Sequence, residues 1–280
     1  MVSLPTKSTW RLIQSPPAPG AWNMAIDEAI LDAAGRGAVL PTLRLYAWQP
    51  ACLSLGYAQP VADVDRPALV ALGWDLVRRP TGGRAILHVD ELTYSVTGPG
   101  DEPRLTGSVL ESYQKLSLAL LAALQCLGIP ARALPKENHS ANIPNATQNP
   151  VCFEVPSNYE ITVDGKKLIG SAQARRKAGV LQHGSLPLYG DLRRITLALA
   201  FSDENARQRA AERLAERATT VEKALGVLPT WQQVAQAFVW AFQETLNLEL
   251  QPGELTLEET QHAGELFQEK YASPAWNEKI

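Results

Sequence analysis

The chain has 280 residues, of which 45% are apolar and 20% charged, so a sizeable core is expected and global disorder is excluded. A net charge of −3 excludes bulk electrostatic attraction to nucleic acid or to an anionic membrane. No apolar run approaches the roughly 20 residues that span a bilayer, and the first residues lack the apolar segment of a signal peptide. We therefore expect a cytoplasmic protein that binds neither nucleic acid nor membrane.

The first hundred residues predict a helix followed by strands. Apolar residues at helical spacing indicate a helix over residues 22–34, which Gly35 ends. Alternating apolar residues then indicate strands over 43–48 and 52–57, and a β-branched and aromatic run indicates another over 92–97. Together these strands predict a sheet.

Residues 78–88, Arg-Arg-Pro-Thr-Gly-Gly-Arg-Ala-Ile-Leu-His, separate two expected strands. Gly82 and Gly83 carry no Cβ, so the backbone here can approach a ligand closely. The three arginines supply fork-shaped donors that suit an anion. A loop of solvated arginines explains the same residues equally well, and residue chemistry alone leaves both interpretations open.

The middle of the chain predicts a long helix over residues 108–127. Ser108 and Glu111 form a capping box at its start, and the Gly-Ile-Pro sequence at 128–130 ends it. Cys126 falls within this apolar helix, where we expect a small buried side chain.

An Asp-Gly pair at 164–165 predicts a β-hairpin with a type I′ turn. Cross-strand pairing then sets three pairs side by side: Val163 with Lys166, Thr162 with Lys167, and Ile161 with Leu168. The two lysines point to opposite faces, and periodicity does not say which of them enters the protein. Another strand is expected over 179–186.

The chain from about residue 191 onward predicts helices. Three further capping boxes are expected there: Thr219 with Glu222, Thr230 with Gln233, and Thr256 with Glu259. Strands with interspersed helices, followed by a helical run, predict an α+β fold.

Cys152 follows a polar stretch, residues 133–151, that contains four asparagines and three prolines. A thiol reacts as a nucleophile only as a thiolate, which nearby cations favour, so Cys152 with a hairpin lysine is a plausible catalytic pair. A loop cysteine without a function is the alternative.

Several common sites are missing from the sequence. It has neither a P-loop nor a dinucleotide-binding glycine fingerprint, and its histidines show no metal-binding spacing, so we expect no metal. The scattered cysteines at 52, 126 and 152 fit neither a disulfide framework nor a zinc site and favour a reducing compartment.

Taken in order, five segments resemble the superfamily of lipoate–protein ligase A, biotin ligase and octanoyltransferase. These segments are residues 22–28, 78–88 with 91–95, 164–173, 182–185 and 270–277. The resemblance covers nearly the whole chain and implies a mixed β-sheet core flanked by helices. It further implies an acyltransferase core over 1–200, with a helical C-terminal part over 201–280 packed on the same domain.

Two activities compete within that superfamily. The ligases activate lipoate with ATP and typically carry a third glycine where this chain has Arg84. The block Pro-Val-Cys-Phe-Glu at 150–154 resembles instead the cysteine-loop octanoyltransferases. These enzymes move an octanoyl group from acyl carrier protein to the lysine of a lipoyl domain, commonly on the glycine-cleavage H protein, and need no cofactor.

The resemblance also implies roles for individual residues. Cys152 becomes the octanoyl thioester, and Lys167 acts near the acyl carbonyl. The residues expected to bind substrate are Arg79, Gly82, Gly83 and His88 on one side and Gly170, Ser171, Ala172, His183 and Gly184 on the other. Family members often have Asp directly after the histidine; here Val89 intervenes, which leaves the role of Asp90 open.

A basic turn at residues 175–177 suits docking of an acidic carrier protein, although a solvated turn explains it as well. The leading hypothesis is therefore a cysteine-dependent octanoyltransferase. An ATP-dependent lipoate ligase and a non-catalytic scaffold that binds lipoyl domains or carrier proteins are the alternatives.

Overall fold

A computed structural model describes residues 6–135, 159–177 and 179–280. Its strands are β1 (Ser8–Gln14), β2 (Thr42–Tyr46), β3 (Cys52–Leu55), β4 (Asp75–Arg78), β5 (Ile86–His88), β6 (Glu91–Gly98), β7 (Arg132–Pro135), β8 (Tyr159–Val163), β9 (Lys166–Arg176), β10 (Gly179–Pro187) and β11 (Leu248–Pro252). Its α-helices are α1 (Gly20–Gly35), α2 (Arg66–Ala71), α3 (Val109–Cys126), α4 (Glu204–Arg217), α5 (Val221–Leu225), α6 (Trp231–Leu246), α7 (Leu257–Leu266) and α8 (Pro274–Asn277). Shorter helical turns are η1 (Val61–Asp63), η4 (Leu192–Leu197) and η5 (Phe267–Tyr271).

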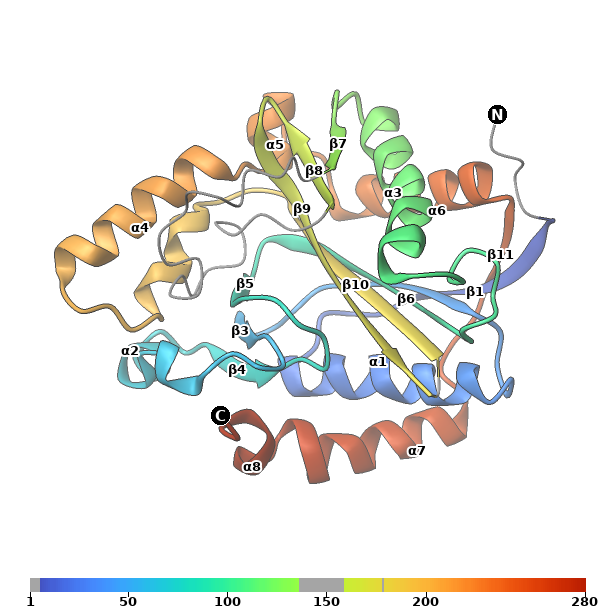
Figure 1. The fold of residues 1–280 in the computed structure, drawn as a ribbon, viewed down its shortest axis with the longest axis horizontal. Coiled ribbons are helices and arrows are strands. Elements are labelled where there is room, and N and C mark those ends of the chain that lie inside the picture. Colours follow the sequence, from blue (N-terminus) through green and yellow to red (C-terminus); the bar gives the residue numbers. More distant parts are fainter. Residues whose placement is uncertain (1–5, 136–158, 178) are drawn as a thin grey trace.

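The described strands form two sheets with helices around them (Figure 1). The large sheet has the order β11-β1-β2-β6-β10-β9-β8-β7, with parallel pairs at the β11 edge and antiparallel pairs elsewhere. The small sheet has the order β4-β3-β5. This mixed sheet with flanking helices confirms the predicted α+β class.

Alternation along the central strands gives the large sheet two different faces. On β6, Leu92, Tyr94 and Val96 join the core beneath α3 and α6, where the Tyr94 ring lies 6.1 Å from Phe238. The intervening hydroxyl residues of β6 point to the other face, toward α1 and the small sheet. One face is therefore an apolar core, and the other is available for polar chemistry.

Residues 201–280 contribute to both faces and to one edge of the large sheet. α6 packs on α3, α7 covers α1 from outside, and β11 pairs in parallel with β1 (Figure 1). None of the described helices combines the length and the apolarity that crossing a membrane requires.

The hairpin has the predicted turn, but its register departs from the prediction. Positive φ angles at Asp164 (49°) and Gly165 (76°) confirm the type I′ turn. The pairs of Thr162 with Lys167 and of Val163 with Lys166 are confirmed, whereas Ile161 pairs with Ile169 rather than with the expected Leu168. A β-bulge adds one residue to β9 at this point and shifts the register beyond it.

Two predictions about single helix residues are wrong: which threonine caps α5, and whether Cys126 on α3 is buried. The residue that caps α5 is Thr220, whose hydroxyl accepts from the backbone of Lys223, rather than Thr219. Cys126 is exposed because it lies two residues, or about 200° around the helix, from buried Leu124. The capping box of Ser108 with Glu111 is confirmed.

Candidate active site

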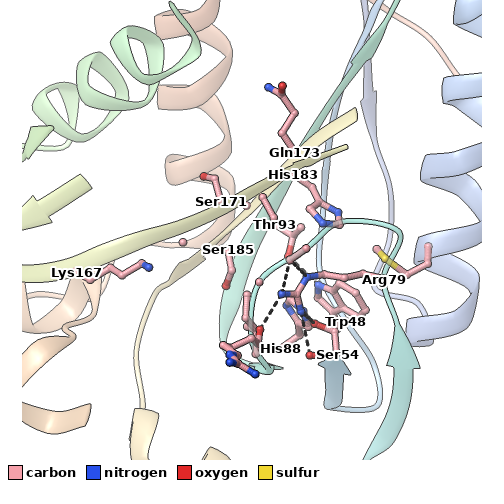
Figure 2. A pocket seen from close by; sticks show the side chains of 18 residues that line it. Trp48, Ser54, Arg79, His88, Thr93, Lys167, Ser171, Gln173, His183 and Ser185 are labelled. Carbon is pink, nitrogen blue, oxygen red and sulfur yellow. Dashed lines mark hydrogen bonds between the residues drawn. The ribbon is translucent and has the colours of Figure 1, made fainter. Parts of the chain in front are cut away.

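A cavity of about 280 Å³ lies between the polar face of the large sheet and the small sheet (Figure 2). Strands β9 and β10 form one wall, and Ser54 of β3 and His88 of β5 belong to the other. The loop from Arg79 to Arg84, which connects β4 to β5, borders the cavity as well. Segments more than a hundred residues apart in the sequence therefore meet here.

The structure brings together the described residues that sequence analysis assigned to the site. Those that line this one cavity are Arg79, Gly82, Gly83, His88, Lys167, Gly170, Ser171, Ala172, His183 and Gly184. Cys152, predicted as the nucleophile, lies outside the described residues.

The cavity also has lining residues that sequence analysis missed: Met24, Trp48, Ser54, Arg84, Ile86, Thr93, Gln173 and Ser185. Two of these carried a usable signal. Ser185 lies two residues beyond His183 and shares its face of β10, and Thr93 is a hydroxyl residue in a strand that is buried throughout. Trp48 and Met24 come from segments that resemble ordinary core.

Lys167 enters the cavity wall from β9, just after the hairpin turn. The residue is 3% exposed, and its Nζ lies 3.0 Å from Oε1 of Glu160 on β8. This carboxylate offsets the desolvation of the ammonium group. Figure 2 shows Lys167 on the opposite side of the cavity from Trp48, Arg79 and His88. Lys166 points away and donates to the carbonyl of Ala215, which answers the question that periodicity left open.

A hydrogen-bonded chain of Ser54, His88 and Glu91 runs along the small-sheet side. Ser54 Oγ lies 2.7 Å from His88 Nε2, and His88 Nδ1 lies 2.8 Å from Glu91 Oε1. The carboxylate also accepts hydrogen bonds from Thr93 and Ser185. Since an ionised carboxylate can only accept, Nδ1 of His88 donates to Glu91, and in the neutral imidazole Nε2 then accepts from Ser54.

The face of the His88 ring packs against a tryptophan. Trp48 stacks on His88 with ring centroids 3.9 Å apart and an interplanar angle of 11°. Its Nε1 donates to Thr93 Oγ1 at 2.7 Å, which ties the ring to the same carboxylate network. A rigid, oriented imidazole therefore faces the cavity.

Arg78 and Arg79 fit neither of the two interpretations offered for this arginine-rich segment. Both are buried rather than solvated, and both donate to backbone carbonyls. Arg78 donates to the carbonyls of Gln59 at 2.5 Å and of Asn277 at 2.9 Å. It therefore joins the small sheet to the C-terminal residues.

Arg79 shapes the loop from Arg79 to Arg84, which we call the glycine loop. It donates to the carbonyls of Gly82 at 2.9 Å and of Arg84 at 2.7 Å, and to Ser54 Oγ at 3.1 Å. Gly83 adopts a φ of +97°, and a Cβ there would lie 2.8 Å from Arg79 Nη2. The loop conformation thus requires glycine at this position.

A second histidine network surrounds Asp27 of α1. Asp27 pairs with Arg44 at 2.8 Å and accepts from Tyr46, while His183 Nδ1 lies 3.7 Å away. Burial opposes ionisation of Asp27, but Arg44 and His183 outweigh it and lower the pKa of the carboxyl group. Burial lowers the pKa of His183 despite the attraction of Asp27. His183 Nε2 lies 2.7 Å from Thr81 Oγ1, next to the glycine loop.

Asp90, whose role the sequence left open, ends the turn between β5 and β6. Its carboxylate pairs with Arg194 at 2.5 Å, and its backbone has a φ of 54°. Asp90 does not line the cavity, so its observed contacts are those of a turn residue.

Residues 19–243 match the family of the lipoyl protein ligase A/B catalytic domain. The chain belongs to this family. The octanoyltransferase LipM of Kyrpidia tusciae is 42% identical over 270 residues, which cover 96% of this chain and 98% of that protein. The LipM of Geobacillus kaustophilus is 38% identical over 275 residues, covering 98% of this chain and 99% of that protein.

Two solved structures with the same fold are lipoate ligases. A bipartite lipoate protein ligase from Thermoplasma acidophilum superposes with a TM-score of 0.78 at 26% identity, covering 98% of this chain and 96% of its own. A lipoate-protein ligase A bound with ATP gives a TM-score of 0.77 at 27% identity, with coverages of 97% and 99%. The predicted family and the predicted fold are confirmed.

Proposed function

We propose that the chain is an octanoyltransferase that acts in lipoate biosynthesis. It moves an octanoyl group from acyl carrier protein, through a thioester on Cys152, to the acceptor lysine of a lipoyl domain such as that of the glycine-cleavage H protein. The observation that carries this proposal is the cavity with Lys167 in one wall and an oriented His88 in the other. Similarity to octanoyltransferases over nearly the whole chain supports it.

The cavity suits a medium-length acyl chain. A cavity of about 150 Å³ holds a molecule the size of benzene, so about 280 Å³ leaves room for eight carbons. Met24, Trp48 and Ile86 supply apolar surface in the lining. Each buried methylene contributes about 0.8 kcal/mol, which favours a chain that fills the cavity.

The proposed reaction has two steps. The Cys152 thiolate attacks the thioester carbonyl of the donor; the new carbon–sulfur bond forms, the old one breaks, and the carrier leaves as a thiol after taking a proton. The neutral amine of the acceptor lysine then attacks the Cys152 thioester; the amide bond forms, the nitrogen loses a proton to solvent, and the carbon–sulfur bond breaks to release the Cys152 thiolate. Exchange of one thioester for another changes the free energy little, so the transfer needs no ATP.

In this proposal, Lys167 supplies the positive charge. An ammonium group beside the acyl carbonyl stabilises both the attacking thiolate and the oxyanion that develops. Glu160 holds the ammonium group in place at 3.0 Å. The glycine loop brings backbone groups close to the thioester from the other side. We place the reaction in the cytoplasm, the compartment expected from the cysteine spacing.

The decisive experiment measures the intact mass of the protein after incubation with octanoyl carrier protein without ATP. Octanoyl addition is expected in the wild type and in Cys126→Ser, which removes the exposed thiol. It is expected to be absent in Cys152→Ala. Cys52 is an unsuitable nucleophile because burial raises the pKa of its thiol well above the usual value. An absent adduct in the wild type, or full transfer by Cys152→Ala, overturns the proposal.

An ATP-dependent lipoate ligase is the second candidate, favoured by the similarity to the ATP-bound lipoate-protein ligase A. It predicts that free lipoate and ATP, rather than an acyl carrier, support modification of the lipoyl domain, with no effect of Cys152→Ala. A non-catalytic scaffold predicts tight binding of a lipoyl domain without turnover in either assay.

A further inference from the structure

A second, more open hollow of about 760 Å³ adjoins the cavity; we call it the outer groove. It shares four lining residues with the cavity: Gly82, Gly83, Arg84 and Gln173. Its remaining walls come from Tyr57 after β3, the end of β9, and the C-terminal residues Lys270 and Trp276. The outer groove therefore leads to the cavity past the glycine loop.

The outer groove is strongly cationic, although the chain carries a net charge of −3. Arg84, Arg175, Arg176 and Lys270 line it, and none of the described residues in its lining is acidic. The carboxylate of Glu28 lies behind the lining, 2.5 Å from Arg176 Nη1 and 2.5 Å from Lys270 Nζ. Glu28 thus orients two cations and offsets part of their charge, and the four cations of the lining still outnumber it.

The cations around the outer groove crowd one another. Burial lowers the pKa of Lys270, and Arg176 lowers it further against the opposing effect of Glu28. Lys279 lies 3.5 Å from the ring centroid of Tyr57 and 3.6 Å from that of Trp276. Its pKa is lowered by burial and then by neighbouring arginines, Arg176 among them. An anion in the groove relieves this repulsion.

We propose that the outer groove binds the prosthetic arm of the acyl donor, with its cations on the phosphodiester of a 4′-phosphopantetheine thioester. This inference rests on the proposed octanoyl transfer. The octanoyl chain and the aliphatic acceptor lysine carry no phosphate, whereas the donor's arm joins a phosphate to amides and ends at the thioester. Gln173 and the glycine loop, with Arg84, line both hollows at the point where the arm's amides pass into the cavity, whereas Arg175 and Arg176 line only the outer groove.

The test compares two small donors, octanoyl-4′-phosphopantetheine and octanoyl-pantetheine, which lacks the phosphate. With a saturating lipoyl-domain acceptor and no ATP, the wild type is expected to show a kcat/KM about tenfold higher for the phosphorylated donor, as expected for one charge-assisted hydrogen bond. Only the phosphorylated donor is expected to lose rate as salt is raised. Arg176→Gln is expected to abolish the preference, and Arg36→Gln, which removes an exposed arginine paired with Glu258, to retain it.

Arg84→Gln provides a second variant, because Arg176 also pairs with Glu28 and its loss can affect folding. Equal rates for the two donors in the wild type, or equal losses for both in Arg176→Gln and Arg84→Gln, overturn the groove assignment while octanoyl transfer stands. Transfer from neither donor nor from octanoyl carrier protein overturns the proposed function itself. If Arg176→Gln impairs only ATP-dependent attachment of free octanoate, the groove binds a nucleotide phosphate and the proposal is wrong.

Discussion

Two buried networks in this protein join a hydroxyl, a histidine and a carboxylate, yet their electrostatics differ. Glu91 lies 2.8 Å from His88 and accepts two further hydrogen bonds from hydroxyl groups. Asp27 lies 3.7 Å from His183 and pairs at 2.8 Å with the buried guanidinium group of Arg44. The first carboxylate directs a proton on its histidine, whereas the charge of the second is largely compensated by an arginine.

The comparison shows that the role of such a hydroxyl–histidine–carboxylate network depends on the other partners of the carboxylate, because both networks contain a histidine. A carboxylate held by hydroxyl groups keeps its charge available to the imidazole and fixes the tautomer. A carboxylate paired with a buried arginine is costly to remove, because the arginine is left buried without its partner, and burial lowers the pKa of its histidine. We therefore expect the Asp27 network to matter most for stability and the Glu91 network most for activity.

The largest effect is expected on removing the charge of Asp27. Asp27→Asn keeps the side-chain shape but leaves Arg44 buried beside a neutral partner, which costs about 3–5 kcal/mol in the free energy of unfolding. Urea unfolding measures this loss. The double variant Asp27→Asn/Arg44→Met removes both charges and is expected to recover most of the stability. A loss below about 1 kcal/mol in the single variant contradicts the assignment of Asp27 as a structural charge.

An intermediate stability effect and a larger activity effect are expected for Glu91→Gln. The amide cannot accept from every group that contacts the carboxylate, so about 1–3 kcal/mol of stability is lost. The amide side chain of this variant also no longer fixes the proton on His88 Nδ1. For that reason kcat/KM for octanoyl transfer is expected to fall about tenfold or more.

The matched control is Glu259→Gln, which breaks the buried pair with Arg11 away from the cavity. This variant is expected to lose stability while its kcat/KM, measured below its unfolding transition, is unchanged. If both variants lose activity in proportion to stability, Glu91 has only a structural role.

Sequence reasoning worked best where the signal is local. The Asp-Gly turn fixed the start of β9, and the box of Ser108 with Glu111 fixed the start of α3, because each depends on neighbours within a few residues. The ordered motifs also gathered most of the cavity lining. The turn and the cap depend on neighbouring residues alone, so distant parts of the chain do not alter them.

The features that were not predicted depend on contacts between residues far apart in the sequence. The burial of Arg78 depends on the carbonyl of Asn277, about two hundred residues later, and no local pattern contains that contact. The bulge opposite Ile161 places one extra residue in β9, and the alternation of the two strands does not predict it. The outer groove was missed because its cations come from three separate segments: the arginine-rich stretch with Arg84, the basic turn at 175–177, and Lys270. No local pattern indicates that these segments meet.

The smallest expected effect is the dependence of stability on pH through His183. Burial places its folded-state pKa below the unfolded value of about 6.5, so the fold favours the neutral imidazole. This contribution is fully present above pH 6.5 and is lost as the pH falls through the lower folded-state pKa; each unit of difference is worth about 1.4 kcal/mol.

Urea unfolding of the wild type and of His183→Gln between pH 5 and pH 8, roughly the range in which histidines titrate, measures the contribution of His183 to stability. The wild type is expected to gain stability over the variant as the pH rises to 6.5 and to keep a constant difference above it. A constant difference across the whole range shows instead that His183 does not titrate there, and a gain on acidification reverses the sign and shows a charged imidazole bound to Asp27.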